Sequence, residues 1–200
     1  MTTAKRVAAK PFDRDLLDFQ WVVRNRIRHD GYLGWHASIR ELSDDDDSPL
    51  LGEVFAIVIP EASGGHLYDT LDALSGDLAL IASVLIDDAG SLSEDVIDEF
   101  GSNNVFGDTL LVIDRVEFVP GARKRDLLRI VLDELVTVTC CVRLVALLPG
   151  PLTELEDKAE HARAVSKIGA NYQAHGFHRV NRKSVVLVAD PDDLLIDGLR

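Results

Sequence analysis

A mixed β-sheet with helices on its faces, an α/β fold, is what the sequence predicts. In the second half of the chain, segments with strand and helix patterns alternate and end in a pair of short strands. Apolar residues make up 46% of the 200 residues, which is enough for a sizeable core. No internal repeat and no Pro- or Ser-rich linker divides the chain. We therefore expect residues 1–200 to form a single domain.

The beginning of the chain has strand patterns around an acidic loop. Residues 1–15 contain basic residues with no apolar stretch behind them, which predicts a short flexible tail and no secretory signal. Residues 16–30 fit both a strand and a helix, and we favour a helical start that leads into an extended stretch. Residues 34–42 and 51–61 are β-rich runs joined by SDDDDSP, so we expect a hairpin with a long acidic loop.

The acidic loop is expected to be solvated. The aspartates at 44–47 are consecutive, whereas calcium loops space their carboxylates and need a turn glycine. We therefore favour a mutually repelling loop over a metal site. The whole chain has a formal net charge of −13, which repels nucleic acid and anionic lipid. No apolar run reaches the roughly 18 residues of a spanning helix. These patterns predict no metal, no nucleic acid and no membrane as partners.

Helix and strand patterns then follow one another regularly. Residues 66–86 have leucines at helical spacing, and Gly76 is a weak point that divides the helix. Ser93 is a candidate cap for a short helix. The later elements are expected in this order: a strand over 109–119 with a buried first half, a helix over 123–139, a buried strand over 141–149, a helix within 150–176, and two short strands within 177–190 that are joined by NRK.

The two cysteines, Cys140 and Cys141, are adjacent. Neighbouring side chains diverge on helices and on strands, so we expect no ordinary disulfide between them. The chain has no further cysteine for a structural zinc site. We interpret the pair as buried thiols that act as small apolar side chains, in a reducing, cytoplasmic setting.

Two local signatures carry a resemblance to a known superfamily. In LLVIDRVEFVPGARKRDLLRIVLDEL, residues 110–135, a strand ending in valine and proline runs through a basic turn into a helix. In YQAHGFHRV, residues 172–180, a tyrosine is followed after three residues by glycine-phenylalanine, basic residues and a valine. With this order of elements, residues 109–190 resemble the GCN5-related N-acetyltransferase (GNAT) superfamily. The earlier residues resemble a divergent version of its first half.

The resemblance implies transfer of an acetyl group from acetyl-CoA, the co-substrate, to an amine on a small molecule or a protein. In such enzymes the strand before the turn separates from its neighbour and offers backbone groups to the pantetheine arm, here those of Val116, Glu117 and Phe118. The turn and the helix start offer N–H groups to the pyrophosphate, which the helix dipole favours. The corresponding residues are Arg123, Lys124, Arg125, Asp126, Leu127 and Leu128.

Two side chains are implied as the acid and the base of this chemistry. Asp114 lies on the strand where superfamily members often place a carboxylate, and it would take the proton of the amine directly or through a water molecule. Tyr172 has the position of the tyrosine that protonates the departing thiolate. The residues themselves leave other readings open: Asp114 could pair with Arg115 or Arg143, and Tyr172 could pack on Phe177.

The turn departs from the superfamily pattern. Asp126 and Leu128 stand where the pattern has glycine or alanine, so a carboxylate would compete with phosphate for the same N–H groups and a bulky side chain would approach it. Arg123, Lys124 and Arg125 could contact the phosphates instead. An alternative function is therefore a catalytically inactive protein of the GNAT fold that acts through protein–protein contacts. A third is binding of another nucleotide or acyl ligand. Exposed strand edges make a homodimer a further expectation.

Overall fold

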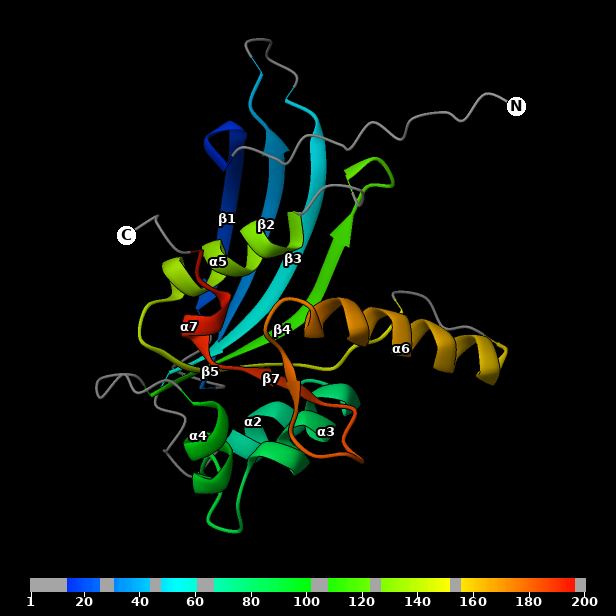
Figure 1. Cartoon of the computed structure of the whole chain (residues 1–200). Coiled ribbons are helices and arrows are strands. Elements are labelled where there is room, and N and C mark those ends of the chain that lie inside the picture. The colour runs from blue at the N-terminus through cyan, green and yellow to red at the C-terminus, as the bar shows by residue number, and fades with distance from the viewer. Residues whose placement is uncertain are drawn as a thin grey trace.

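A mixed β-sheet forms the centre of the protein. The structure, a computed structural model, describes residues 14–25, 31–43, 48–60, 67–101, 108–122, 127–151 and 156–196. Within them, the strands form one sheet in the order β1-β2-β3-β4-β5-β7-β6 (Figure 1). β4 and β5 are parallel, and the other neighbours are antiparallel. The strands are β1 (Leu17–Asn25), β2 (Leu33–Glu41), β3 (Leu50–Ile59), β4 (Thr109–Phe118), β5 (Val142–Leu147), β6 (His178–Arg179) and β7 (Leu187–Ala189).

Helices flank the sheet, as the α/β prediction requires. In Figure 1, α5 lies over the long strands, and α2, α3 and α4 gather together below the sheet. The helices are α2 (Leu67–Asp72), α3 (Gly76–Leu85), α4 (Glu94–Phe100), α5 (Leu127–Thr139), α6 (Lys158–Gln173) and α7 (Pro191–Leu194). The predicted fold class, a mixed sheet flanked by helices, is therefore confirmed.

One face of the sheet packs against α5, the end of α6 and α7. α5 buries a broad apolar stripe, which includes the fully buried side chains of Leu127, Val131 and Leu135. These side chains share a cluster with Leu111 and Ile113 of β4. Full burial of one such side chain stabilises the fold by about 1.5–3 kcal/mol. The apolar stripe therefore holds α5, which follows the turn after β4 in the sequence, against this face of the sheet.

The other face packs against α2, α3 and α4. Leu71, Ile81 and Leu85 from these helices share a second apolar cluster with Leu110 and Val112 of β4. The predicted division near Gly76 is confirmed, because α2 ends before it and α3 begins at Gly76. Ser75 caps α3 by accepting a hydrogen bond from the backbone N–H of Leu78 at 3.2 Å. Ser93 is the N-cap residue of α4, without a capping hydrogen bond from its side chain.

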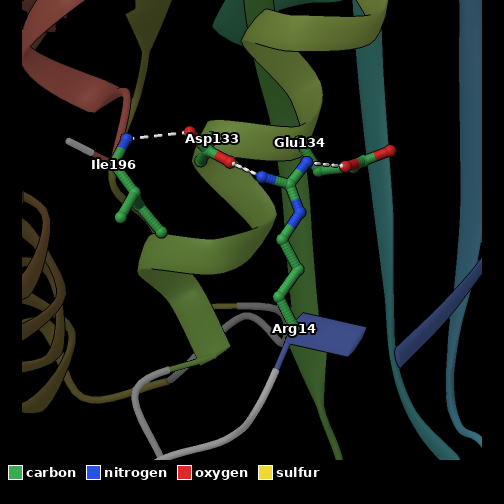
Figure 2. Close-up of polar contacts among 4 residues, drawn as sticks. All are labelled: Arg14, Asp133, Glu134 and Ile196. Atoms are coloured by element: carbon green, nitrogen blue, oxygen red, sulfur yellow. Dashed lines mark hydrogen bonds and ion pairs between the residues drawn. The ribbon is translucent and has the colours of Figure 1, made fainter. Parts of the chain in front are cut away.

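A buried carboxylate joins the two ends of the described chain (Figure 2). Asp133 of α5 is 2% exposed and accepts a hydrogen bond and an ion pair from Arg14, which precedes β1. Its second oxygen accepts the backbone N–H of Ile196 at 2.8 Å. Arg14 also donates to Glu134 at 2.5 Å. α5 is thereby held to the chain before β1 and to the chain after α7.

The structure also decides several finer expectations. The described part of the stretch at 16–30 is the end of a short 3₁₀ turn (Arg14–Leu16) followed by β1, which ends at Asn25, and the hairpin is β2 with β3. Both Cys140 and Cys141 are exposed, so their interpretation as buried thiols was wrong. α5 ends at Thr139 and both cysteines then take left-handed backbone angles, with φ of 54° and 52°, so neither continues the buried stripe of the helix. The connection between β6 and β7 is longer than NRK.

Two expectations about the first half of the chain lie outside the described residues. They are the flexible tail, apart from its last two residues, and the aspartates at 44–47 of the acidic loop.

Candidate functional site

β4 and β5 separate halfway along β4. Their parallel pairing runs from Thr109 opposite Val142 to Ile113 opposite Leu147, where β5 ends. β4 continues from there to Phe118, paired with β3 only. We call the side of residues 114–118 that faces away from β3 the β4 edge. The sequence-based expectation that this strand leaves its neighbour ahead of the basic turn agrees with this geometry.

A β-bulge marks the point of separation. On β3, Phe55 lies opposite Arg115 and Ala56 lies opposite Ile113, so Asp114 has no opposite residue. An extra residue of this kind bends its strand and increases the local twist, and bulges are common next to active sites. Asp114, the candidate base, is therefore the residue at which β4 turns away from β5.

Backbone direction on the β4 edge follows from a single hydrogen bond. The N–H of Val119 donates to the carbonyl of Leu51 on β3 at 2.9 Å. Backbone groups alternate in direction along a strand, so those of Glu117 also face β3, whereas those of Val116 and Phe118 face the β4 edge. Of the three residues expected to meet a pantetheine arm, Val116 and Phe118 have the required direction and Glu117 does not.

Asp114 is an exposed carboxylate in a mixed electrostatic environment. Partial burial raises the pKa of Asp114 above its ordinary value of 3.8, the positive charge of Arg115 opposes this rise, and the negative charge of Asp77 on α3 adds to it. Of the expected pairing with Arg115, the structure has the electrostatic interaction, while the ion pair of Arg115 is with Glu117 at 3.2 Å. Asp114 thus keeps an accessible carboxylate with increased basicity.

Sequence reasoning missed a stack of side chains beside Asp114. The guanidinium of Arg115 lies 4.0 Å from the centre of the Phe55 ring, and the ring of His36 stacks on Phe55 at 4.3 Å. His36 contacts Glu53 at 3.2 Å. The stack joins β2, β3 and β4 across one face of the sheet. The alternation of polar and apolar residues along the three strands could have placed these side chains on one face, but their alignment depends on the register.

Tyr172 lies in the core near the end of α6. Its ring meets Phe177 edge to face at 5.5 Å, and the residue is 9% exposed. This is the packing that the alternative interpretation expected. Burial raises the pKa of Tyr172 to about 12, so its phenol stays protonated throughout the neutral range.

The structure does not bring Asp114 and Tyr172 into contact. Tyr172 belongs to the cluster under α5, whereas Asp114 interacts electrostatically with Asp77 of α3, which packs on the other face. A ligand between β4 and β5 would have to reach both. Among the residues described by the structure, no hydrogen bond or ring contact joins the two side chains.

The candidate phosphate site is described only in part. Arg123, Lys124, Arg125 and Asp126 lie outside the described residues. α5 begins at Leu127, which is fully buried, and Leu128 is 7% exposed. Both side chains pack into the cluster beneath α5, so the leucine at the pattern's second glycine position is directed into the core, where it does not crowd an anion at the helix start.

Within the described ranges, no group of three or more His, Cys, Asp or Glu side chains could hold a metal ion. Nor is any helix there long and apolar enough to cross a membrane.

Comparison of the chain with models of protein families, with curated proteins and with solved structures gave no match.

Proposed function

We propose that the protein is an N-acetyltransferase that transfers the acetyl group of acetyl-CoA to an amine. The observation that supports this most is the β4 edge. Beyond the bulge β4 no longer pairs with β5, so its backbone on that side has no neighbouring strand. A chain that contains amide groups can pair with such backbone as another strand would. The pantetheine arm of acetyl-CoA contains two amide groups of this kind.

The β4 edge would position the thioester through backbone contacts. The N–H and C=O of Val116 face this edge, and they lie two residues beyond the bulge at Asp114. Hydrogen bonds from one arm amide to Val116 would therefore place the following thioester near Asp114. The start of α5 lies at the other end of the same junction, and the positive end of its dipole favours the phosphates of the ligand.

In the proposed reaction the amine nitrogen attacks the thioester carbonyl carbon and the carbon–sulfur bond breaks. The proton lost by the amine passes to Asp114, directly or through water, and then to solvent. Partial burial and the nearby charge of Asp77 raise the pKa of Asp114, which makes it a better base than an ordinary aspartate. The departing thiolate takes a proton from Tyr172, whose pKa of about 12 keeps the phenol protonated beforehand, and the resulting phenolate regains a proton from solvent.

The charge of the site favours a cationic acceptor. Asp114, Asp77, Glu53 and Glu117 lie around the junction and outweigh the positive charge of Arg115 there, and the chain as a whole has a formal net charge of −13. A field of this sign attracts an ammonium group before it is deprotonated. A primary amine on a cationic small molecule or on a lysine-rich peptide is therefore the acceptor class that we propose.

The test measures release of the CoA thiol with a thiol-reactive dye while acetyl-CoA is incubated with a panel of primary amines. We expect turnover with cationic amines, and losses of about 10²–10⁴-fold in kcat for Asp114→Asn, the size usual for a general base. Tyr172→Phe should lower kcat with little change in KM. Asp98→Asn, an exposed neutralisation on α4, is the charge control and should keep full activity.

Two results of these experiments would contradict the proposed activity. If acetyl-CoA binds but no amine is acetylated, and Asp114→Asn does not alter binding, the catalytic assignment is refuted. If acetyl-CoA does not bind, the catalytically inactive alternative that acts through protein–protein contacts takes its place.

A further inference from the structure

β1 is the end strand of the sheet, and its outer edge is long and regular. It pairs with β2 over its full length, from Leu17 opposite Glu41 to Asn25 opposite Leu33, without a bulge. In the described part of the chain no strand pairs with its other edge. β1 contains no proline, and Val22 and Val23 are 54% and 48% exposed. An edge of this kind is a template for another strand.

The direction of the β1 backbone is fixed by its neighbour. The N–H of Leu42 donates to the carbonyl of Leu16 at 2.7 Å, which continues the β1–β2 ladder by one residue. Because backbone groups alternate along a strand, the even-numbered residues of β1 face β2. The odd-numbered residues, which include Phe19, Trp21 and Val23, therefore direct their N–H and C=O groups to the outer edge.

The sequence of β1 is complementary to itself in antiparallel orientation. When two copies overlap along the full strand, Leu17 lies opposite the partner's Asn25, and Trp21 lies opposite the partner's Trp21 on the two-fold axis. The same register places Asp18 opposite the partner's Arg24, twice in the dimer. Opposite charges that face one another across strands attract, so full overlap and charge pairing select the same register.

In neighbouring registers the overlap of the two strands is shorter, and Asp18 no longer lies opposite the partner's Arg24. The odd-numbered residues must face one another to form hydrogen bonds, so the strands can slip only by two residues in the pairing. One slip places Asp18 opposite the partner's Val22, and the other places Arg24 opposite the partner's Gln20. Each also shortens the overlap of the two strands. The full-overlap register is thus the one in which every charge of β1 has an opposite partner.

The apolar side chains agree with this register as well. Phe19, Trp21 and Val23 lie on one face of β1, and Phe19 and Trp21 pack against the apolar cluster below α5. A two-fold axis perpendicular to the sheet keeps this face on the same side in both copies. Phe19 then lies opposite the partner's Val23, which covers a valine that is 48% exposed in the single chain.

We propose that the protein forms a symmetric homodimer in which β1 pairs antiparallel with β1 of a second copy, centred on Trp21 and registered by Asp18 and the partner's Arg24. The two sheets then form one continuous sheet, and the β4 edge of each copy lies three strands away from the interface. This dimer does not depend on the proposed activity, since no residue of β1 belongs to the junction of β4 and β5.

Charge exchange tests both the dimer and its register. Light scattering after gel filtration should give a mass near twice 22.0 kDa for the wild type. Asp18→Arg and Arg24→Asp each place like charges opposite one another at two points, and each should raise the dissociation constant of the dimer about tenfold or more. Circular dichroism verifies that each variant remains folded, since Arg24 is exposed and the half-buried Asp18 accepts a hydrogen bond from Gln20 of the same strand and lies opposite Arg40 of β2.

Two further samples separate the proposed register from any other. Mixing the Asp18→Arg chain with the Arg24→Asp chain restores opposite charges at both points, so the mixture should form heterodimers with the affinity of the wild type. The double variant Asp18→Arg/Arg24→Asp should again form homodimers. A monomeric wild type at about 0.1 mM would overturn the proposal, as would a dimer that tolerates each single variant or one that mixing fails to restore.

Discussion

Replacing Asp133 is expected to lower the stability of the whole fold. Its carboxylate is 2% exposed, accepts from Arg14 and receives the backbone N–H of Ile196 at 2.8 Å. Breaking a buried pair by removing one partner costs about 3–5 kcal/mol. The Arg14 side chain is 26% exposed and can recover some hydration, so we place the cost of Asp133→Ala at about 2–4 kcal/mol.

The measurement is equilibrium unfolding in urea followed by circular dichroism, with thermal unfolding alongside. For a chain of this length about 2–4 kcal/mol corresponds to a fall of roughly 5–15 °C in Tm. Glu134→Ala is the matched control on the same helix, because it removes the other partner of Arg14 and leaves the Ile196 contact intact. It should cost about 1 kcal/mol or less.

Asp133→Asn separates the two contacts of this carboxylate. The amide keeps an oxygen that can accept the N–H of Ile196 but loses the charge that attracts Arg14, so the cost should lie between those of Asp133→Ala and Glu134→Ala. A free energy of unfolding for Asp133→Ala within about 0.5 kcal/mol of the wild type would refute the idea that this side chain fastens both chain ends to α5.

Three other predictions concern the candidate site. Burial raises the pKa of Asp114 above 3.8, so its contribution to stability is present below that pH and is lost as the pH rises through the raised pKa. Asp114→Asn should therefore flatten the dependence of stability on pH in this window, measured by urea unfolding at several pH values. An unchanged dependence would contradict the assignment. The pKa of Tyr172 is raised from 10.0 to about 12, so its contribution to stability is present below pH 10 and is lost as the pH rises through about 12. Absorbance at alkaline pH should show one late-titrating tyrosine that disappears in Tyr172→Phe. If the late titration persists in this variant, it belongs to another residue. A Cβ at Gly52 would lie 2.4 Å from the carbonyl oxygen of Glu117 and 2.6 Å from the Phe118 ring. Gly52→Ala should therefore cost about 1–3 kcal/mol in urea unfolding and weaken ligand binding at the β4 edge. Gly121→Ala is the control, because a Cβ there meets nothing within 4 Å, and it should change neither stability nor binding.

The fold class could be predicted because it depends on local patterns. The apolar first half of β4, the alternation in β2 and β3, and the break at Gly76 are each visible within a short window of sequence. The wrong interpretation of Cys140 and Cys141 has a local cause as well. The chain leaves α5 through two consecutive residues with left-handed backbone angles, and this conformation cannot be predicted from the residue type cysteine.

The candidate site could be predicted only where it follows the chain. The junction of β4 and α5 was found because its elements are adjacent in sequence. The bulge at Asp114 depends on the register between β3 and β4, and the burial of Asp133 depends on Arg14, which is 119 residues away. Such features arise from the meeting of distant segments, and a periodic pattern in one segment does not contain them.

Calorimetric titration with acetyl-CoA tests the central claim most directly. If the β4 edge binds the pantetheine arm, the wild type should give saturable one-to-one binding below about 1 mM, the upper end of usual substrate affinities. Val116→Pro removes an N–H that faces the β4 edge without removing a hydrogen bond to β3, so it should weaken binding while Val116→Ala, which keeps the N–H, binds normally. The account predicts that order; no heat from the wild type at about 1 mM acetyl-CoA, or equal binding by both variants, would contradict it.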